Sequence, residues 1–147
     1  MKPESVFSVV NVVAFLAWLT LIVRPRHPRT LQWIGQVVPW FFALIYFVII
    51  ALRIGRSAGN FSSLAGVAAL FQDPWILLAG WVHYLAFDLL IGVWEVRDAA
   101  TRNLPHWRVV PCLLLTFMFG PVGWLLYQGV RSMSSQNQSP EAMSASS

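Results

Sequence analysis

Two residues capable of acid–base chemistry lie near the middle of a run that is otherwise apolar enough to cross a membrane. The run extends from Trp75 to Trp94, and the two residues are His83 and Asp88. An ionised carboxylate in hydrocarbon carries a large energetic cost, so such residues usually face a bundle interior and serve a function. The run therefore indicates catalysis, ligand binding or proton transfer inside a membrane.

The polar groups of this run and of the turn after it gather in one sector of the predicted helix. With His83 taken as zero, Tyr84 falls at about 100° and Asp88 at about 140°. Glu95 and Asp98 fall at about 120° and 60°. Tyr84 and Asp88 stand four residues apart, which allows a hydrogen bond between phenol and carboxylate. The helix is predicted to line a cavity from mid-membrane to one mouth.

Each of these residues also has a purely structural interpretation. In that interpretation the Asp88 carboxyl group is hydrogen-bonded by Asn11 or Thr116 of a neighbouring helix. The His83 imidazole then satisfies backbone groups freed by a proline kink. The last two carboxylates lie beside arginines at the membrane boundary, where solvated ion pairs are common.

The spacing on this helix argues against a metal centre. The candidate oxygen and nitrogen ligands are His83, Asp88, Glu95 and Asp98. A step of five residues turns a side chain about 140° away, unlike the i, i+3 or i, i+4 pairs that converge on one ion. No cofactor is predicted either, because no phosphate loop, dinucleotide fingerprint, nucleophile elbow or paired-cysteine motif occurs.

The composition places these residues in an integral membrane protein. Of the 147 residues, 57% are hydrophobic and 11% are charged, and the mean hydropathy is +0.62. Each of four apolar runs has about the 20 residues that a spanning helix needs. Because lipid cannot satisfy backbone polar groups, the predicted fold is all-α, a four-helix membrane bundle. The predicted helices are 6–23, 33–52, 75–94 and 109–130, the first of them a retained helix because no cleavage site follows it.

Two further segments complete the predicted organisation. Between the second and third helices, apolar residues from Phe61 to Phe71 recur at helical spacing, which predicts a short interfacial helix. Residues 132–147 are rich in Ser, Gln and Asn and are predicted to be a disordered polar tail. This leaves 1–131 as a single transmembrane domain.

The basic residues are spread over the helix ends. The net charge is +4, but no basic patch suited to nucleic acid is present. Loops one and three together hold six Lys or Arg residues, and the opposite side holds four. The positive-inside rule then predicts that loops one and three face the cytoplasm and that both termini lie outside.

Three segments carry a family resemblance. They are FSSLAGVAALFQDP at 61–74, GWVHYLAFDLLIGVWEVRDA at 80–99 and PCLLLTFMFGPVGWLLY at 111–127. Together they resemble the abscisic-acid-deficient-four-like membrane proteins, whose plant members are neoxanthin synthases. The N-terminal half shares only their hydrophobic outline. The resemblance implies a carotenoid-handling enzyme, and the family motif falls on Trp81, His83, Tyr84, Asp88, Glu95 and Asp98.

The plant reaction sets the chemical expectation. It converts an epoxy-carotenoid into an allenic one, an isomerisation that needs an acid at the epoxide oxygen and a base at a polyene carbon. We expect Asp88 to be the acid or proton shuttle, His83 the base and Tyr84 the orienting group. Glu95 completes the expected catalytic set. The expected substrate-binding residues are Trp81, Phe87, Trp94, Asn11 and Thr116.

The substrate is expected to be a carotenoid or a related polyene. The chain lacks the transit segment of the plant proteins, which favours a bacterial inner membrane and leaves the plant epoxide in doubt. Two other functions stay open: a non-enzymatic carotenoid or lipid-binding protein, and a small proton-coupled transporter. Four helices enclose little volume, which favours a homodimer in contact with membrane lipids.

Overall fold

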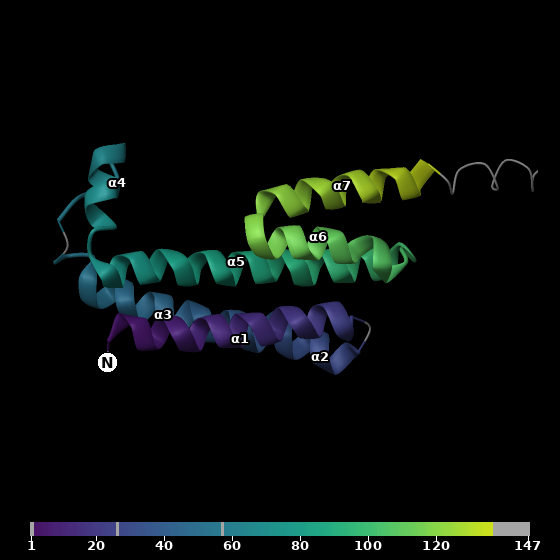
Figure 1. Ribbon diagram of the computed structural model, residues 1–147, viewed down its shortest axis with the longest axis horizontal. Helices are drawn as coiled ribbons and strands as arrows, with labels where there is room; N and C mark the ends of the chain where they lie inside the picture. Colours follow the sequence, from purple (N-terminus) through teal and green to yellow (C-terminus); the bar gives the residue numbers. More distant parts are fainter. Residues whose placement is uncertain (1, 26, 57, 137–147) are drawn as a thin grey trace, which may run out of the picture.

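Long apolar helices dominate the computed structural model, which describes residues 2–25, 27–56 and 58–136 (Figure 1). Three helices are long and apolar enough to cross a membrane: α1 (Pro3–Val23), the continuous helix formed by η1 (Trp33–Val37) and α3 (Val38–Arg53), and α5 (Pro74–Thr101). All regular structure in the described ranges is helical. The all-α prediction is therefore confirmed. The first two predicted spans agree with these helices to within a few residues, whereas α5 continues to Thr101, well beyond the predicted end at residue 94.

A proline shapes the start of the second long helix. Pro39 lies in the first turn of α3, and the turn before it, η1, is π-helical, with the amide of Val38 donating to the carbonyl of Trp33. A π-helical turn absorbs a local misfit in the hydrogen-bond ladder without ending the helix. The helix therefore continues through Pro39 as one span.

The central helix of the molecule is α5. Its most apolar window is 56% buried, against 28% for α1 and 22% for the second long helix. The rings and methyl groups of α1 that face inward recur at helical spacing, from Val10 to Leu21. Among them, the Trp18 ring packs onto Gly92, where an added Cβ would lie 2.5 Å from the indole. Figure 1 shows α1 and α3 along one side of α5, and α6 and α7 along the other.

The predicted fourth span, 109–130, is wrong as a single helix. The chain instead forms two short antiparallel helices, α6 (His106–Phe119) and α7 (Pro121–Gln136), which fold back on each other (Figure 1). Gly120 between them has φ +39°, and Pro121 has no N–H to continue the ladder of α6. At 14 residues, α6 is about 21 Å long, too short for a core of roughly 30 Å.

The folded-back hairpin changes the predicted topology. The end of α7 lies at the same end of the molecule as α2 (Pro28–Gln32), whereas the start of α1 lies at the opposite end (Figure 1). Three candidate spans in the described ranges, an odd number, differ from the four on which the prediction of both termini on one side of the membrane was based.

A short helix, α4 (Leu64–Leu70), lies between the second and third spans, as predicted. Its first turn is capped by Ser63, whose hydroxyl accepts from the amide of Gly66 at 3.0 Å. Asp73 caps α5 in the same way, accepting from the amide of Trp75 at 2.8 Å. At the other end of the chain α7 continues to Gln136, five residues into the predicted tail, and the rest of that tail lies outside the described residues.

Candidate functional site

The carboxyl group of Asp88 faces the turn between α6 and α7. Its side chain comes from the middle of α5, and the residue is 7% exposed. A Cβ on Gly120 would lie 2.6 Å from Asp88 Oδ1, so only a glycine leaves room for the carboxyl group. Asp88 Oδ2 is buried and has no hydrogen-bond partner among the described residues. An unpaired buried oxygen of this kind is costly, which marks Asp88 for a role beyond packing.

Tyr84 joins Asp88 to the hairpin. Its hydroxyl group donates to the carbonyl oxygen of Phe117 at 3.0 Å. That carbonyl lies four residues before Pro121, which has no N–H, so the break in the hairpin leaves an acceptor that Tyr84 satisfies. The Tyr84 hydroxyl also lies within hydrogen-bonding reach of the Asp88 carboxyl group. The structure thus brings together the pair that the four-residue spacing predicts.

Glu95 lies two turns further along the same stripe of α5 and is fully buried. Its Oε1 accepts from the hydroxyl group of Thr116 on α6 at 2.9 Å. Its Oε2 is buried without a hydrogen-bond partner among the described residues. The Cys112 thiol, one turn before Thr116, is close enough to interact electrostatically with Glu95. Asp88 and Glu95 are therefore two separate, incompletely paired carboxyl groups, both facing the α6–α7 hairpin.

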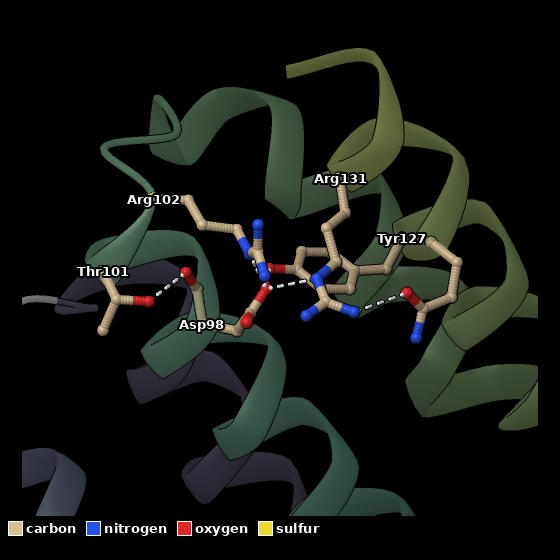
Figure 2. A network of polar contacts seen from close by, with 6 residues as sticks. Asp98, Thr101, Arg102, Tyr127 and Arg131 are labelled. Atoms are coloured by element: carbon tan, nitrogen blue, oxygen red, sulfur yellow. Dashed lines mark hydrogen bonds and ion pairs between the residues drawn. The ribbon is translucent and has the colours of Figure 1, made fainter. Parts of the chain in front are cut away.

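Asp98, in contrast, is paired with two arginines and ties α5 to α7 (Figure 2). Its Oδ2 accepts from Arg102 Nε at 2.9 Å and from the Tyr127 hydroxyl at 2.7 Å. The Nε of Arg131 lies 3.2 Å from the same oxygen. Trp94 packs edge-on against Tyr127 with ring centroids 5.5 Å apart, so this predicted substrate-binding residue belongs to the Asp98 network.

His83 lies in a different environment from Asp88. Its ring packs between the rings of Tyr46, at 5.5 Å, and Phe87, at 4.6 Å. It lines a cavity of about 190 Å³ between α3, α4 and α5. In the described part of the chain, no group of three or more His, Cys, Asp or Glu residues is arranged to hold a metal ion. The expected base and the expected acid are thus not brought together, and neither are the four candidate metal ligands.

An apolar groove between α1 and α5, the α1–α5 groove, leads to Tyr84. It has a volume of about 580 Å³. Its wall carries a chain of aromatic rings from Phe7 through Trp81 to Tyr84, with centroid distances of 5.7 Å and 5.4 Å. The other lining residues are Pro3, Glu4, Ser8, Phe71, Pro74, Leu77, Leu78 and Gly80.

Hydrogen bonds fix the aromatic wall of this groove. The indole N–H of Trp81 donates to Asn11 Oδ1 at 3.1 Å, and the Asn11 amide donates to the carbonyl of Phe7 at 2.7 Å. Asn11 thus orients Trp81, and Thr116 serves Glu95, so neither is hydrogen-bonded to Asp88 as the structural interpretation required.

Three residues of the site escape reasoning from the sequence: Phe117, Gly120 and Tyr127. Phe117 contributes a backbone carbonyl, which no residue type reveals. Gly120 was visible as a helix breaker, but its contact with Asp88 depends on the direction in which the chain turns. Tyr127 and Arg131 stand four residues apart on α7, and this spacing was the available signal for a shared partner.

A comparison with protein families identifies the family of this chain. A family model described as ABA DEFICIENT 4-like matches residues 5–127. The chain belongs to this family. The match covers most of the α1–α5 groove and the hairpin as far as Tyr127, and the family is linked to neoxanthin synthesis, a part of carotenoid metabolism. No curated protein and no solved structure matches the chain.

Proposed function

We propose that this ABA DEFICIENT 4-like protein is a membrane enzyme that isomerises a carotenoid or a related polyene at one end ring. The observation that carries the proposal is the position of Tyr84, which lines the α1–α5 groove and contacts the buried Asp88. A flat apolar ligand fits a groove whose wall is a row of aromatic rings. Family membership supports a carotenoid as the ligand class.

The isomerisation needs one proton in and one proton out. In an epoxide-to-allene conversion, the C–O bond at the ring carbon next to the polyene breaks and the oxygen takes a proton. The neighbouring polyene carbon loses its proton, and its bonding electrons form the new double bond. Atoms and electrons balance without an oxidant, so a group that first gives and then takes a proton suffices.

Asp88 is suited to both proton transfers. It is buried, and no cation contacts it among the described residues, which favours the protonated form. Since the Tyr84 hydroxyl donates to Phe117, it is left as an acceptor toward Asp88, which again places the proton on the carboxyl group. We propose that Asp88 protonates the oxygen, directly or through Tyr84, and that its carboxylate then removes the proton from the adjacent carbon.

Pigment analysis tests this function. The chain is co-expressed with enzymes that supply epoxidised carotenoids, and the pigments are extracted and separated. We expect an isomer of unchanged mass, absent with Asp88→Asn and still formed with His83→Ala. Pigment that co-purifies chemically unchanged with the wild type would instead support a carrier. Loss of product with His83→Ala in a folded protein would restore histidine as the base.

We also propose an orientation in the membrane. With the hairpin folded back, six of the nine Lys and Arg residues in the described ranges belong to segments at the end of the molecule where α7 finishes. The three others, Lys2, Arg53 and Arg56, belong to the opposite end. The positive-inside rule then places the end of α7 in the cytoplasm and the start of α1 outside. Reporter domains fused to the two termini test this, and the expected homodimer stays a prediction for size measurements in detergent.

A further inference from the structure

A second apolar groove, the α1–α3 groove, lies on the other flank of α1 and has a volume of about 530 Å³. Val6 and Val9 of α1 form one wall, whereas Phe7 and Ser8 face the α1–α5 groove. Ile49, which is 5% exposed, belongs to its buried side. The two grooves share no lining residue, so a ligand in one leaves the residues of the other unoccupied.

The length of the α1–α3 groove matches one leaflet of a bilayer. Its lining on α3 runs from Phe41 to Arg53. Twelve helical steps correspond to about 18 Å, slightly more than half of a hydrocarbon core of roughly 30 Å. Arg53 lies in the last turn of α3, at the end of the molecule where α1 begins (Figure 1). The groove therefore extends from that membrane surface to the bilayer midplane.

The lining of this groove is apolar except at Arg53 and Trp75. Among the described residues that line the groove, Arg53 is the only charged one, and the Trp75 indole is the only other polar side chain. The guanidinium carbon of Arg53 lies 5.3 Å from the centroid of the Trp75 ring. A guanidinium group binds phosphate through paired hydrogen bonds. The lining thus suits a ligand that is hydrocarbon along its length and carries an anionic group at one end.

We propose that the α1–α3 groove binds one acyl chain of an anionic phospholipid whose phosphate contacts Arg53. The two grooves differ in the ligand that they fit. Glu4, Ser8 and Tyr84 line the α1–α5 groove. These side chains can form hydrogen bonds with the hydroxyl groups of a neutral polyene, whereas the carboxylate of Glu4 repels an anionic headgroup. This lipid site goes beyond the proposed isomerisation and does not depend on it.

Native mass spectrometry of the full chain in mild detergent tests the site. Phosphatidylglycerol and phosphatidylcholine with identical acyl chains are added at equal concentrations. We expect phosphatidylglycerol to bind more tightly to the wild type and Arg53→Ala to weaken it on the order of tenfold. Arg56→Ala is the matched control, since it removes a charge at the same end of the molecule but outside the groove, and should retain the lipid.

A second variant tests the groove and not the charge alone. Val48 lines the groove and is exposed, so Val48→Trp fills the space of the acyl chain and keeps Arg53. We expect it to lose the bound phosphatidylglycerol while its circular dichroism stays that of the wild type. Equal retention by Arg53→Ala or Val48→Trp and the wild type overturns the proposal. Preference for the neutral lipid, or a polyene that Val48→Trp displaces, also overturns it.

Discussion

Three carboxyl groups of α5 face the same hairpin, but they are paired very differently. Asp98, near one end of the helix, accepts from two arginines and a tyrosine through a single oxygen. Asp88 and Glu95, deeper in the molecule, each keep one buried oxygen that has no partner among the described residues. The first arrangement joins α5 to α7, whereas the other two agree with the proton transfer that we propose.

This contrast distinguishes Asp98 from the two acids that we propose as reactive, and it does so better than burial. Asp98 is itself largely buried, with a side chain that is 13% exposed. Two guanidinium groups, however, hold its carboxylate in the charged form, whereas no cation contacts Asp88 or Glu95 among the described residues. A buried carboxyl group with an unpaired oxygen is a better candidate for function than one that is held by cations.

The largest effect should come from removing the proton donor of Asp88. Asp88→Asn keeps the shape of the side chain, and general acid–base catalysis is worth about 10²–10⁴-fold in rate. We expect turnover to fall by that amount in the pigment assay, with the apparent Tm in detergent unchanged. Asp98→Asn is the matched control and should retain most of the turnover. Equal losses in the two variants would remove the distinction between the acids.

A side chain at Gly120 should disturb the Asp88 site directly. Gly120→Ala places a methyl group against the carboxyl group and forces L-residue geometry at φ +39°, which costs about 1–3 kcal/mol of stability. Gly129→Ala, in the middle of α7 with open space around it, is the control and should be neutral or slightly stabilising. Thermal unfolding in detergent measures both.

A double-mutant cycle assigns the cost at Gly120 to its cause. If the methyl group clashes with the carboxyl group, the penalty of Gly120→Ala should shrink in an Asp88→Ala background. An unchanged penalty in that background would assign the whole cost to backbone strain.

Deleting the single partner of Glu95 should cost stability. Thr116→Val keeps the volume but leaves both oxygens of Glu95 without the hydroxyl donor, at an expected cost of about 1–3 kcal/mol. Thr116→Ser keeps the donor and should lose less. The apparent Tm of the two variants separates the lost hydrogen bond from the lost methyl group.

The smallest effect is expected at the paired acid. Asp98→Asn removes two ion pairs at a partly hydrated site, where such pairs contribute about 1 kcal/mol or less each. The loss should appear as faster hydrogen exchange in α7, with α1 unchanged. Protection that stays equal in α7 would show that packing of Trp94 against Tyr127 holds the hairpin by itself.

Much of the fold follows from the sequence because lipid permits so few structures. Three apolar runs of about 20 residues become the three long helices, and their bounds agree to within a few residues except at the end of α5. The run at 109–130 has the length of a span, so length alone misleads. The turn at Gly120 and Pro121 was recognisable as a break, but a kinked span and a folded-back hairpin share that signal.

The site was predictable where a single helix determines it. Tyr84 and Asp88 meet because four residues bring side chains onto one face. His83 stands about 140° from Asp88, and that angle lets the two side chains face different neighbours, α3 for the histidine and the hairpin for the aspartate. Contacts made by other helices, such as Asn11 with Trp81, depend on packing that the sequence pattern does not contain.

The folded-back hairpin gives the molecule two unequal halves. The helices α6 and α7 lie along α5 toward the end where α7 finishes, whereas α1, α3 and α5 continue toward the start of α1 (Figure 1). The chain thus has the outline of a wedge, and the narrow half leaves the side of α5 before the hairpin turn open to lipid tails. A ligand diffusing in the plane of that leaflet approaches Asp88 from one direction. If the ligand is a polyene with two equivalent end rings, as we propose, only one ring at a time reaches Asp88.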